Sequence, residues 1–144
     1  MPITIKTLKL HPDARLPRYA HTGPYGDLAA DLHAVSAATL QSGETLAIST
    51  GIALAFPPDF GALVEDRSGM ALRGLTTLAG VIDPGYRGEI KVVLTNLSAN
   101  SHTIAAGDRI AQLRIVKRLE AAFALVEELD ETARDTGGFG STGA

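Results

Sequence analysis

The sequence predicts an all-β domain, and three observations support that fold class. Short β-type runs separated by turn residues recur along most of the 144 residues. Within "EIKVVLTN", Ile90, Val92 and Leu94 fall on one face, as a strand with one better-buried face requires. Proline and glycine mark the breaks, as in "FPPDFG" (56–61) and "DPGYRG" (83–88). Regular strand spacing with tight turns is typical of a sandwich, a jelly roll or a small barrel.

Each expected strand is a run with β-type composition that ends at a turn signal. In chain order, the expected strands are 3–10, 45–50, 52–56, 61–66, 88–97, 102–107 and 108–119. One later stretch, "RLEAAFALVEEL" (118–129), instead predicts a helix. Leu119, Ala122, Phe123 and Val126 repeat there at helical spacing.

Composition and charge exclude several classes of function. The net charge is −3, and no basic run is interleaved with aromatic residues, so a nucleic-acid polymer is not an expected partner. The absence of cysteine rules out disulfides and thiolate metal sites and is compatible with a reducing cytoplasm. No apolar stretch is long enough to span a bilayer, and the N-terminal residues lack the apolar core of a signal peptide. We therefore expect a soluble, cytoplasmic protein without a membrane partner.

The C-terminal residues "RDTGGFGSTGA" (134–144) combine four glycines with an arginine, a phenylalanine and hydroxyl groups. Ordering so much glycine costs entropy, so the simplest interpretation is a frayed terminus. "GFGSTG" also matches the pattern GxGxxG, but it lacks the strand before and the helix after that dinucleotide binding requires. We expect a β domain over residues 1–133 and a flexible, glycine-rich arm over residues 134–144.

Four further stretches are too polar and too rich in glycine for simple β structure: 30–34, 66–74, 80–90 and 106–113. Each has a plain structural interpretation. Asp83 would start a turn, Asp31 would end or cap a strand, residues 67–69 would form a turn before a short helix, and Gln112 would be a solvated strand residue. The four histidines, His11, His21, His33 and His102, show no metal-ligand spacing.

Taken together, however, these residues favour a nucleotide site. "RSG" (67–69) offers a guanidinium group, a hydroxyl and a backbone N–H, and the C-terminal residues offer another arginine, hydroxyls and glycine amides; both sets suit phosphate oxygens. Phe139 lies between glycines and is free to stack on a flat ring. Asp31 and Asp83 supply carboxylates for a hard, hydrated cation or for activating a water nucleophile.

In their order and spacing, these stretches resemble the trimeric deoxyuridine triphosphate nucleotidohydrolases (dUTPases). The motifs that carry the resemblance are "GVIDPGYRGEI" (80–90), "VVLTN" (92–96), "GDRIAQL" (107–113) and "GGFGSTG" (137–143). The resemblance implies a jelly-roll-like (β-clip) subunit in a homotrimer, with active sites shared between chains and closed by the C-terminal arm. It also implies Mg²⁺-assisted hydrolysis of dUTP to dUMP and pyrophosphate through water attack on the α-phosphorus. Such an activity keeps uracil out of DNA and supplies dUMP for thymidylate synthesis.

The resemblance also implies a role for each site residue. Asp83 is the expected general base, Tyr86 the ring that packs beneath deoxyribose, and Asp31 the carboxylate that holds Mg²⁺ through water. The expected phosphate contacts are Arg67, Ser68, Gly69 and Gln112, and the expected γ-phosphate clamp is Arg134, Ser141 and Thr142. The remaining substrate-binding positions are Thr77, Leu78, Ala79 and Gly80 at the base and Phe139 and Gly140 in the arm. Such a site works by positioning the reactants and neutralising charge.

Three positions depart from the family pattern. Ala29 stands where glycine is usual, two residues before Asp31. Asp66 replaces the usual proline, which either puts a negative charge beside the phosphate site or holds Arg67 in place. Thr77 stands where many bacterial members read uracil with asparagine, so recognition is expected to use main-chain groups near Leu78 to Gly80.

Two rival functions share this fold. A deoxycytidine triphosphate deaminase resembles the chain around "DPGYRGEI", but such enzymes need a catalytic glutamate where this sequence has Val93, which cannot move a proton. A non-catalytic nucleotide-binding regulator is the second rival. The presence of Asp83, Tyr86 and Arg134 together argues against it.

Overall fold

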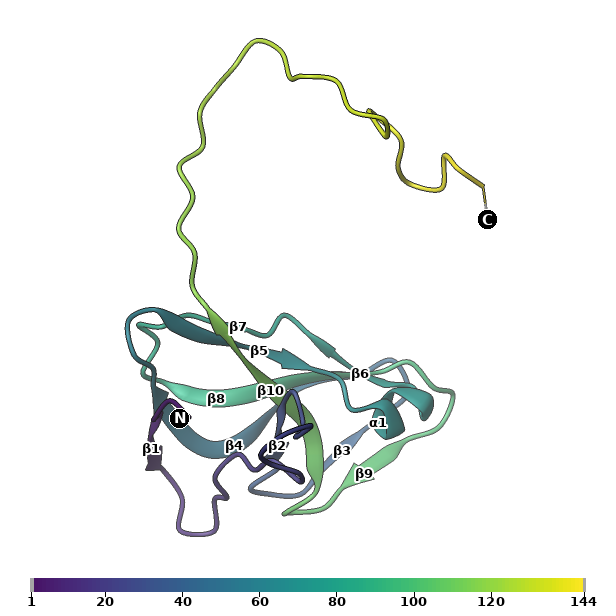
Figure 1. Cartoon of the computed structure of the whole chain (residues 1–144). Helices are drawn as coiled ribbons and strands as arrows, with labels where there is room; N and C mark the ends of the chain where they lie inside the picture. The colour runs from purple at the N-terminus through teal and green to yellow at the C-terminus, as the bar shows by residue number, and fades with distance from the viewer. Residues whose placement is uncertain (1, 144) are drawn as a thin grey trace.

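A computed structural model describes residues 2–143 of the chain. Over these residues it forms antiparallel β-sheets and one short helix (Figure 1). The elements in chain order are β1 (Lys6–Lys9), β2 (Ala30–His33), β3 (Ala38–Leu40), β4 (Thr45–Ala55), β5 (Phe60–Glu65), α1 (Ser68–Leu72), β6 (Leu75–Leu78), β7 (Val81–Ile82), β8 (Glu89–Asn96), β9 (His102–Ile104) and β10 (Arg109–Lys117). The all-β prediction is confirmed.

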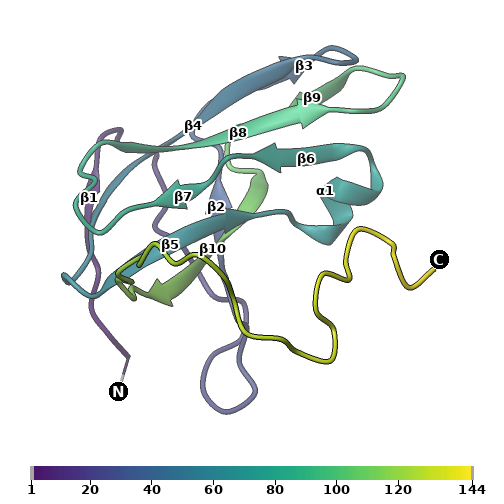
Figure 2. The same cartoon turned by 90° about the horizontal axis from the view of Figure 1, so that it is seen from above.

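The strands form two four-stranded sheets around one core. Their strand orders are β1-β4-β8-β6 and β2-β10-β5-β7, while β3 pairs with β9 in a third, two-stranded sheet (Figure 2). Both larger sheets contribute fully buried side chains, including Ile52 and Ile90 from the first and Leu32 and Leu113 from the second. Burial of these faces against each other stabilises the jelly-roll-like domain.

The predicted strands with clear hydrophobic patterns are present. In β8, Ile90, Val92 and Leu94 are buried while Lys91 is exposed, as the alternation predicts. The runs 45–50 and 52–56 are joined in the single strand β4, whose register against β8 shifts near Gly51. The sequence did not reveal β2, β3, β6 and β7, because these strands have two to four residues and β2 and β6 are rich in polar side chains.

The predicted helix over residues 118–129 is wrong. Beyond β10 the chain instead extends away from the sheets (Figure 1). The Phe123 and Leu125 side chains are 98% and 102% exposed, and Leu119 is almost as open. A helix of this length depends on burial of its apolar face, and this segment has no surface of its own domain against which to fold. Among residues 2–143, the helical structure lacks any segment long and apolar enough to cross a membrane.

A β-bulge in β10 decides which of its side chains face outward. The pairing of β10 with β2 shifts between Arg109 and Ala111. Ile110 and Ala111 are consecutive yet both fully buried, which the extra residue of a bulge permits. After the shift, Gln112 and Arg114 point away from the core, on the same side of the strand as Arg109.

Candidate functional site

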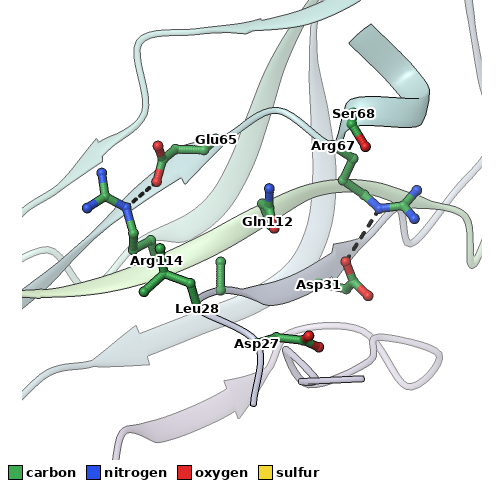
Figure 3. A pocket seen from close by; sticks show the side chains of 9 residues that line it. Asp27, Leu28, Asp31, Glu65, Arg67, Ser68, Gln112 and Arg114 are labelled. Carbon is green, nitrogen blue, oxygen red and sulfur yellow. Dashed lines mark hydrogen bonds and ion pairs between the residues drawn. The ribbon is translucent and has the colours of Figure 1, made fainter. Parts of the chain in front are cut away.

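A polar cavity of about 500 Å³ lies on the outward face of the β2-β10-β5-β7 sheet, beside α1 (Figure 3). It is lined by Asp27, Leu28, Ala29, Asp31, Glu65, Arg67, Ser68, Gln112 and Arg114. Four of these residues, Asp31, Arg67, Ser68 and Gln112, are site residues predicted from three separate stretches of sequence. The fold therefore brings together four of the residues expected to bind phosphate or Mg²⁺.

Asp31 occupies β2 directly opposite Gln112 of β10. Arg67 Nε lies 3.4 Å from Asp31 Oδ1, and Arg109 Nη1 lies 3.5 Å from Asp31 Oδ2. Arg67 Nη1 also donates a hydrogen bond of 3.2 Å to the Arg109 carbonyl. The Arg67 guanidinium group lines the cavity and keeps further N–H donors for an anion there. Sequence reasoning missed Arg109, although it lies within the motif that supplies Gln112.

The turn before α1 is open on the side of the cavity. Ser68 begins the helix, and the first N–H groups of a helix have no carbonyl partner within it. A Cβ added at Gly69 would meet no atom within 4 Å, so packing within this chain does not require glycine there. The open position next to Arg67 and Ser68 leaves room for a ligand to approach the backbone closely.

Asp66 points away from this cavity and toward β6. Its carboxylate accepts hydrogen bonds from Thr76 Oγ1 (2.6 Å), Thr77 N (2.6 Å) and Thr77 Oγ1 (2.7 Å). Partial burial acts to raise the pKa of Asp66, but the hydrogen bonds from Thr76 and Thr77 outweigh it and leave that pKa below its ordinary value. The sequence suggested that Asp66 either faces the phosphate site or holds Arg67. Its carboxylate instead binds Thr76 and Thr77 and so links the loop after β5 in one large sheet to β6 in the other.

The residues expected to contact the base are the last two of β6, Thr77 and Leu78, and the two of the bend that follows, Ala79 and Gly80. Ala79 and Gly80 have successive positive φ angles of 60° and 107°. Val64 N donates to the Gly80 carbonyl at 2.8 Å. A Cβ at Gly80 would lie 2.7 Å from the Val64 carbonyl oxygen, so glycine is required both by the conformation and by this close approach.

Asp83 and Tyr86 lie at the two ends of a tight turn between β7 and β8. Tyr86 N donates to the Asp83 carbonyl at 3.1 Å, which closes the predicted turn. The phenol folds back, because Tyr86 Oη donates to the Glu89 carbonyl at 2.8 Å. The ring lies over Gly88, where an added Cβ would be only 2.5 Å from Tyr86 Oη. Tyr86 remains 45% exposed and is available to a ligand.

The segment that carries the predicted arm residues extends away from the β-sheets that hold the cavity and residues 77–86 (Figures 1 and 2). Arg134 Nε donates to the Gly137 carbonyl at 2.8 Å, and Gly138 N donates to Ser141 Oγ at 2.8 Å, and both bonds are local to the arm. Phe139 is fully exposed at a φ of 50°. Gly140, at a φ of 82°, and Thr142 belong to the same exposed segment. A single chain thus presents the predicted site residues at separate places: in the cavity, along residues 77–86 and in the arm.

Comparison with known proteins identifies the family. The dUTPase family model matches residues 19–143, which is most of the chain. The chain belongs to the dUTPase family. It is 49% identical over 142 residues to the deoxyuridine 5'-triphosphate nucleotidohydrolase of Solibacter usitatus, covering 96% of this chain and 95% of that protein. The corresponding dUTPase of Thermobifida fusca is 47% identical over 145 residues, covering 98% of this chain and 79% of that protein.

Solved dUTPase structures show the same fold. The dUTPase of Staphylococcus bacteriophage 80alpha, solved with dUpNHpp, superimposes with a TM-score of 0.85 at 26% identity. The match covers 98% of this chain and 99% of that one. Because the match spans nearly the whole chain, it includes the β-sheets that hold the cavity.

Proposed function

We propose that the chain is a dUTP diphosphatase, which hydrolyses dUTP to dUMP and pyrophosphate by water attack on the α-phosphorus. One observation carries the proposal: in a member of the dUTPase family, Asp31, Arg67, Ser68 and Gln112 line a single polar cavity. Their guanidinium, hydroxyl and amide groups supply the donors that a triphosphate needs. In a cytoplasmic setting, this activity would keep uracil out of DNA and supply dUMP for thymidylate synthesis.

Catalysis would rest on positioning and on balancing charge. Arg67, Ser68 and Gln112, with the free N–H groups at the start of α1, would orient the phosphates. Asp83 would accept the proton from the attacking water, because a carboxylate in an exposed turn can approach a bound phosphate through one water. Tyr86 would pack beneath deoxyribose and leave no room for a 2′-hydroxyl. The hydrogen bond from its phenol to the Glu89 carbonyl would keep the ring in that place.

The cavity also fits a Mg²⁺ ion held through water. Asp31 places one carboxylate among cationic side chains in a polar space, and Mg²⁺ beside phosphates is usually bound by one or two carboxylates and its own waters. Among residues 2–143, no group of three or more His, Cys, Asp or Glu side chains is arranged to hold a metal ion. A metal site built from protein ligands alone is therefore not expected in this part of the chain. When bound, the ion would neutralise phosphate charge.

The arrangement of one chain supports a homotrimer with shared active sites. Asp83, Tyr86 and the arm residues lie outside the lining of the phosphate cavity, so completing the site within one chain would require large movements. The extended segment after β10 also exposes Leu119, Phe123 and Leu125, which is unfavourable unless another surface covers them. Contacts with neighbouring copies would cover this segment and bring residues 134–144 over a site formed by the domains of residues 1–133.

Product analysis tests the proposed function. The full-length protein is incubated with each deoxynucleoside triphosphate and UTP in the presence of Mg²⁺, and the products are separated by chromatography. We expect dUMP and pyrophosphate from dUTP, and no ammonia or dUTP from dCTP, because Val93 cannot serve as the deaminase acid-base group. Deamination of dCTP or an absence of dUTP hydrolysis would refute the assignment.

Light scattering tests the assembly. We expect a mass of three times the 15.0 kDa chain. A stable monomer with full activity would refute the shared site while leaving the chemistry of the reaction in place.

A further inference from the structure

We propose that Asp66 is a positioning residue that sets selectivity for the nucleotide base by fixing residues 77–80 relative to the phosphate-binding turn at Arg67. This inference rests on the proposed hydrolysis of dUTP. Asp66 itself does not line the cavity, so its effect would be transmitted through the backbone segment that it holds.

Asp66 joins strands of both large sheets. Its backbone follows β5, and its carbonyl accepts a hydrogen bond of 2.7 Å from Gln112 Nε2 of β10. Its carboxylate binds Thr76 and Thr77 of β6, which belongs to the other sheet. One residue therefore connects Gln112 and Arg67, which face the phosphate cavity, with the strand that leads to the base-contacting positions.

The contact with Thr77 occupies a free strand edge. β6 is the last strand of its sheet and pairs on one side only, with β8. The Thr77 N–H donates to the Asp66 carboxylate at 2.6 Å instead of to a neighbouring strand. A hydrogen bond to a charged acceptor is stronger than one between neutral groups. Asp66 thus fixes the position of β6 near its C-terminal end.

The segment that follows needs such support. Ala79 has a φ of 60°, a conformation that a non-glycine residue keeps only when its surroundings hold it. The bond from Val64 N to the Gly80 carbonyl holds the far end of the bend, and the three bonds to Asp66 hold the near end. With both ends held, the main-chain groups between them have one arrangement in which to meet a base.

Loss of the carboxylate would remove the support on the free edge of β6 at the near end of this bend, while the pairing of Leu78 with Val93 of β8 would remain. The Val64–Gly80 contact would keep the segment folded, and Asp31 and Arg67 would keep their mutual contact in the phosphate cavity. The expected defect is therefore a loss of discrimination between bases. A general loss of phosphate binding or of folding is not expected.

The test measures kcat/KM for dUTP and dCTP in Asp66→Ala, Asp66→Asn and Thr77→Val. We expect Asp66→Ala to lower the dUTP-to-dCTP ratio by roughly 10- to 100-fold, the effect of losing a hydrogen bond to a charged group. Asp66→Asn should have a smaller effect, because the amide oxygen still accepts from the Thr77 N–H without a full charge. Thr77→Val should also have a smaller effect, because it keeps the N–H bond and loses only the hydroxyl.

Glu44→Ala is the matched control. Glu44 Oε1 accepts a hydrogen bond of 3.1 Å from Gln41 N in a turn that precedes β4, which β8 separates from β6. The variant thus removes a carboxylate that binds a backbone N–H outside the base-contacting segment. Its dUTP-to-dCTP ratio should match that of the unmodified protein.

Amide hydrogen exchange of the ligand-free protein gives a second readout that does not depend on catalysis. We expect faster exchange at residues 77–80 in Asp66→Ala and Asp66→Asn, and unchanged exchange there in Glu44→Ala. If Asp66→Ala does not fold, Asp66→Asn and Thr77→Val still give both measurements. An unchanged dUTP-to-dCTP ratio in the folded Asp66 variants would overturn the inference, even with a lower Tm. If the unmodified protein lacks dUTP hydrolysis, the proposed function fails, and exchange still reports whether Asp66 holds the segment.

Discussion

Gly88→Ala should displace the Tyr86 ring, although the substitution adds only one methyl group. The new Cβ would lie 2.5 Å from Tyr86 Oη, 2.7 Å from Cζ and 2.9 Å from Cε1. Ordinary contact begins at 3.4 Å, so the hydroxyl must move by about 0.9 Å. The ring is the end of a flexible, partly exposed side chain, so it should swing outward before the backbone shifts.

The size of the effect follows from the contact that the movement breaks. Tyr86 Oη lies 2.8 Å from the Glu89 carbonyl, and an outward shift of this size, directed away from that oxygen, takes the pair beyond hydrogen-bonding distance. Loss of one such bond is worth about 1 kcal/mol, which corresponds to roughly 5-fold in an equilibrium constant. Because the ring is the group proposed to exclude a 2′-hydroxyl, kcat/KM for dUTP should fall roughly 5-fold and the preference for dUTP over UTP should fall with it.

Gly85→Ala provides the control within the same turn. A Cβ at Gly85 would meet no atom within 4 Å, and Gly85 has no positive φ. Steady-state kinetics with dUTP and UTP should therefore separate two variants that differ only in which glycine gains a methyl group. Equal kinetic constants for Gly88→Ala and Gly85→Ala would refute the role assigned to the Tyr86 position.

Three further changes test other parts of the molecule. Ending the chain before Arg134 should leave Tm nearly unchanged but lower turnover by roughly 10²- to 10³-fold, the usual effect of losing a charge-stabilising donor; full activity would mean that the arm is only a frayed terminus. Asp83→Asn should slow single-turnover hydrolysis by roughly 10²- to 10⁴-fold while calorimetry shows near-normal affinity for a non-hydrolysable dUTP analogue; normal turnover would leave Asp83 with its turn alone. The stabilisation from Asp66 should be constant above its unfolded-state pKa of 3.8 and lost as the pH falls through the lower folded-state pKa, and urea unfolding of Asp66→Asn should lack this loss.

The sequence predicted the parts of the fold in which local pattern and packing agree. In β8, alternate residues are buried, and the strand was identified correctly. β2 was missed because it has only four residues and two of them, Asp31 and His33, are polar. The segment after β10 misled in the opposite way, because Leu119 and Phe123 fit a helical spacing but are exposed along an extended chain. Periodicity reports which side chains are apolar, not which surface covers them.

The candidate site shows a similar division. Chemistry and resemblance together named Asp31, Arg67 and Gln112, which the fold brings to one cavity. The ion pair of Arg109 with Asp31 and the bonds of Asp66 to β6 depend on how strands from distant parts of the sequence meet. No local pattern contains that information, because the partners are separated by tens of residues or lie in different sheets.

The bulge between Arg109 and Ala111 gives β10 one residue more than a regular pleat needs to reach from Arg109 to Gln112. Removing Ile110 would leave Ala111 opposite Leu32 and Gln112 opposite Asp31, so the side chains beyond the bulge would keep their facing. Removing a residue after the bulge, such as Gln112, would instead turn Leu113 toward the cavity and Arg114 into the core. Single-residue deletions in this strand should therefore be tolerated better at the bulge than after it, a bias that a library of single deletions along β10 can measure directly.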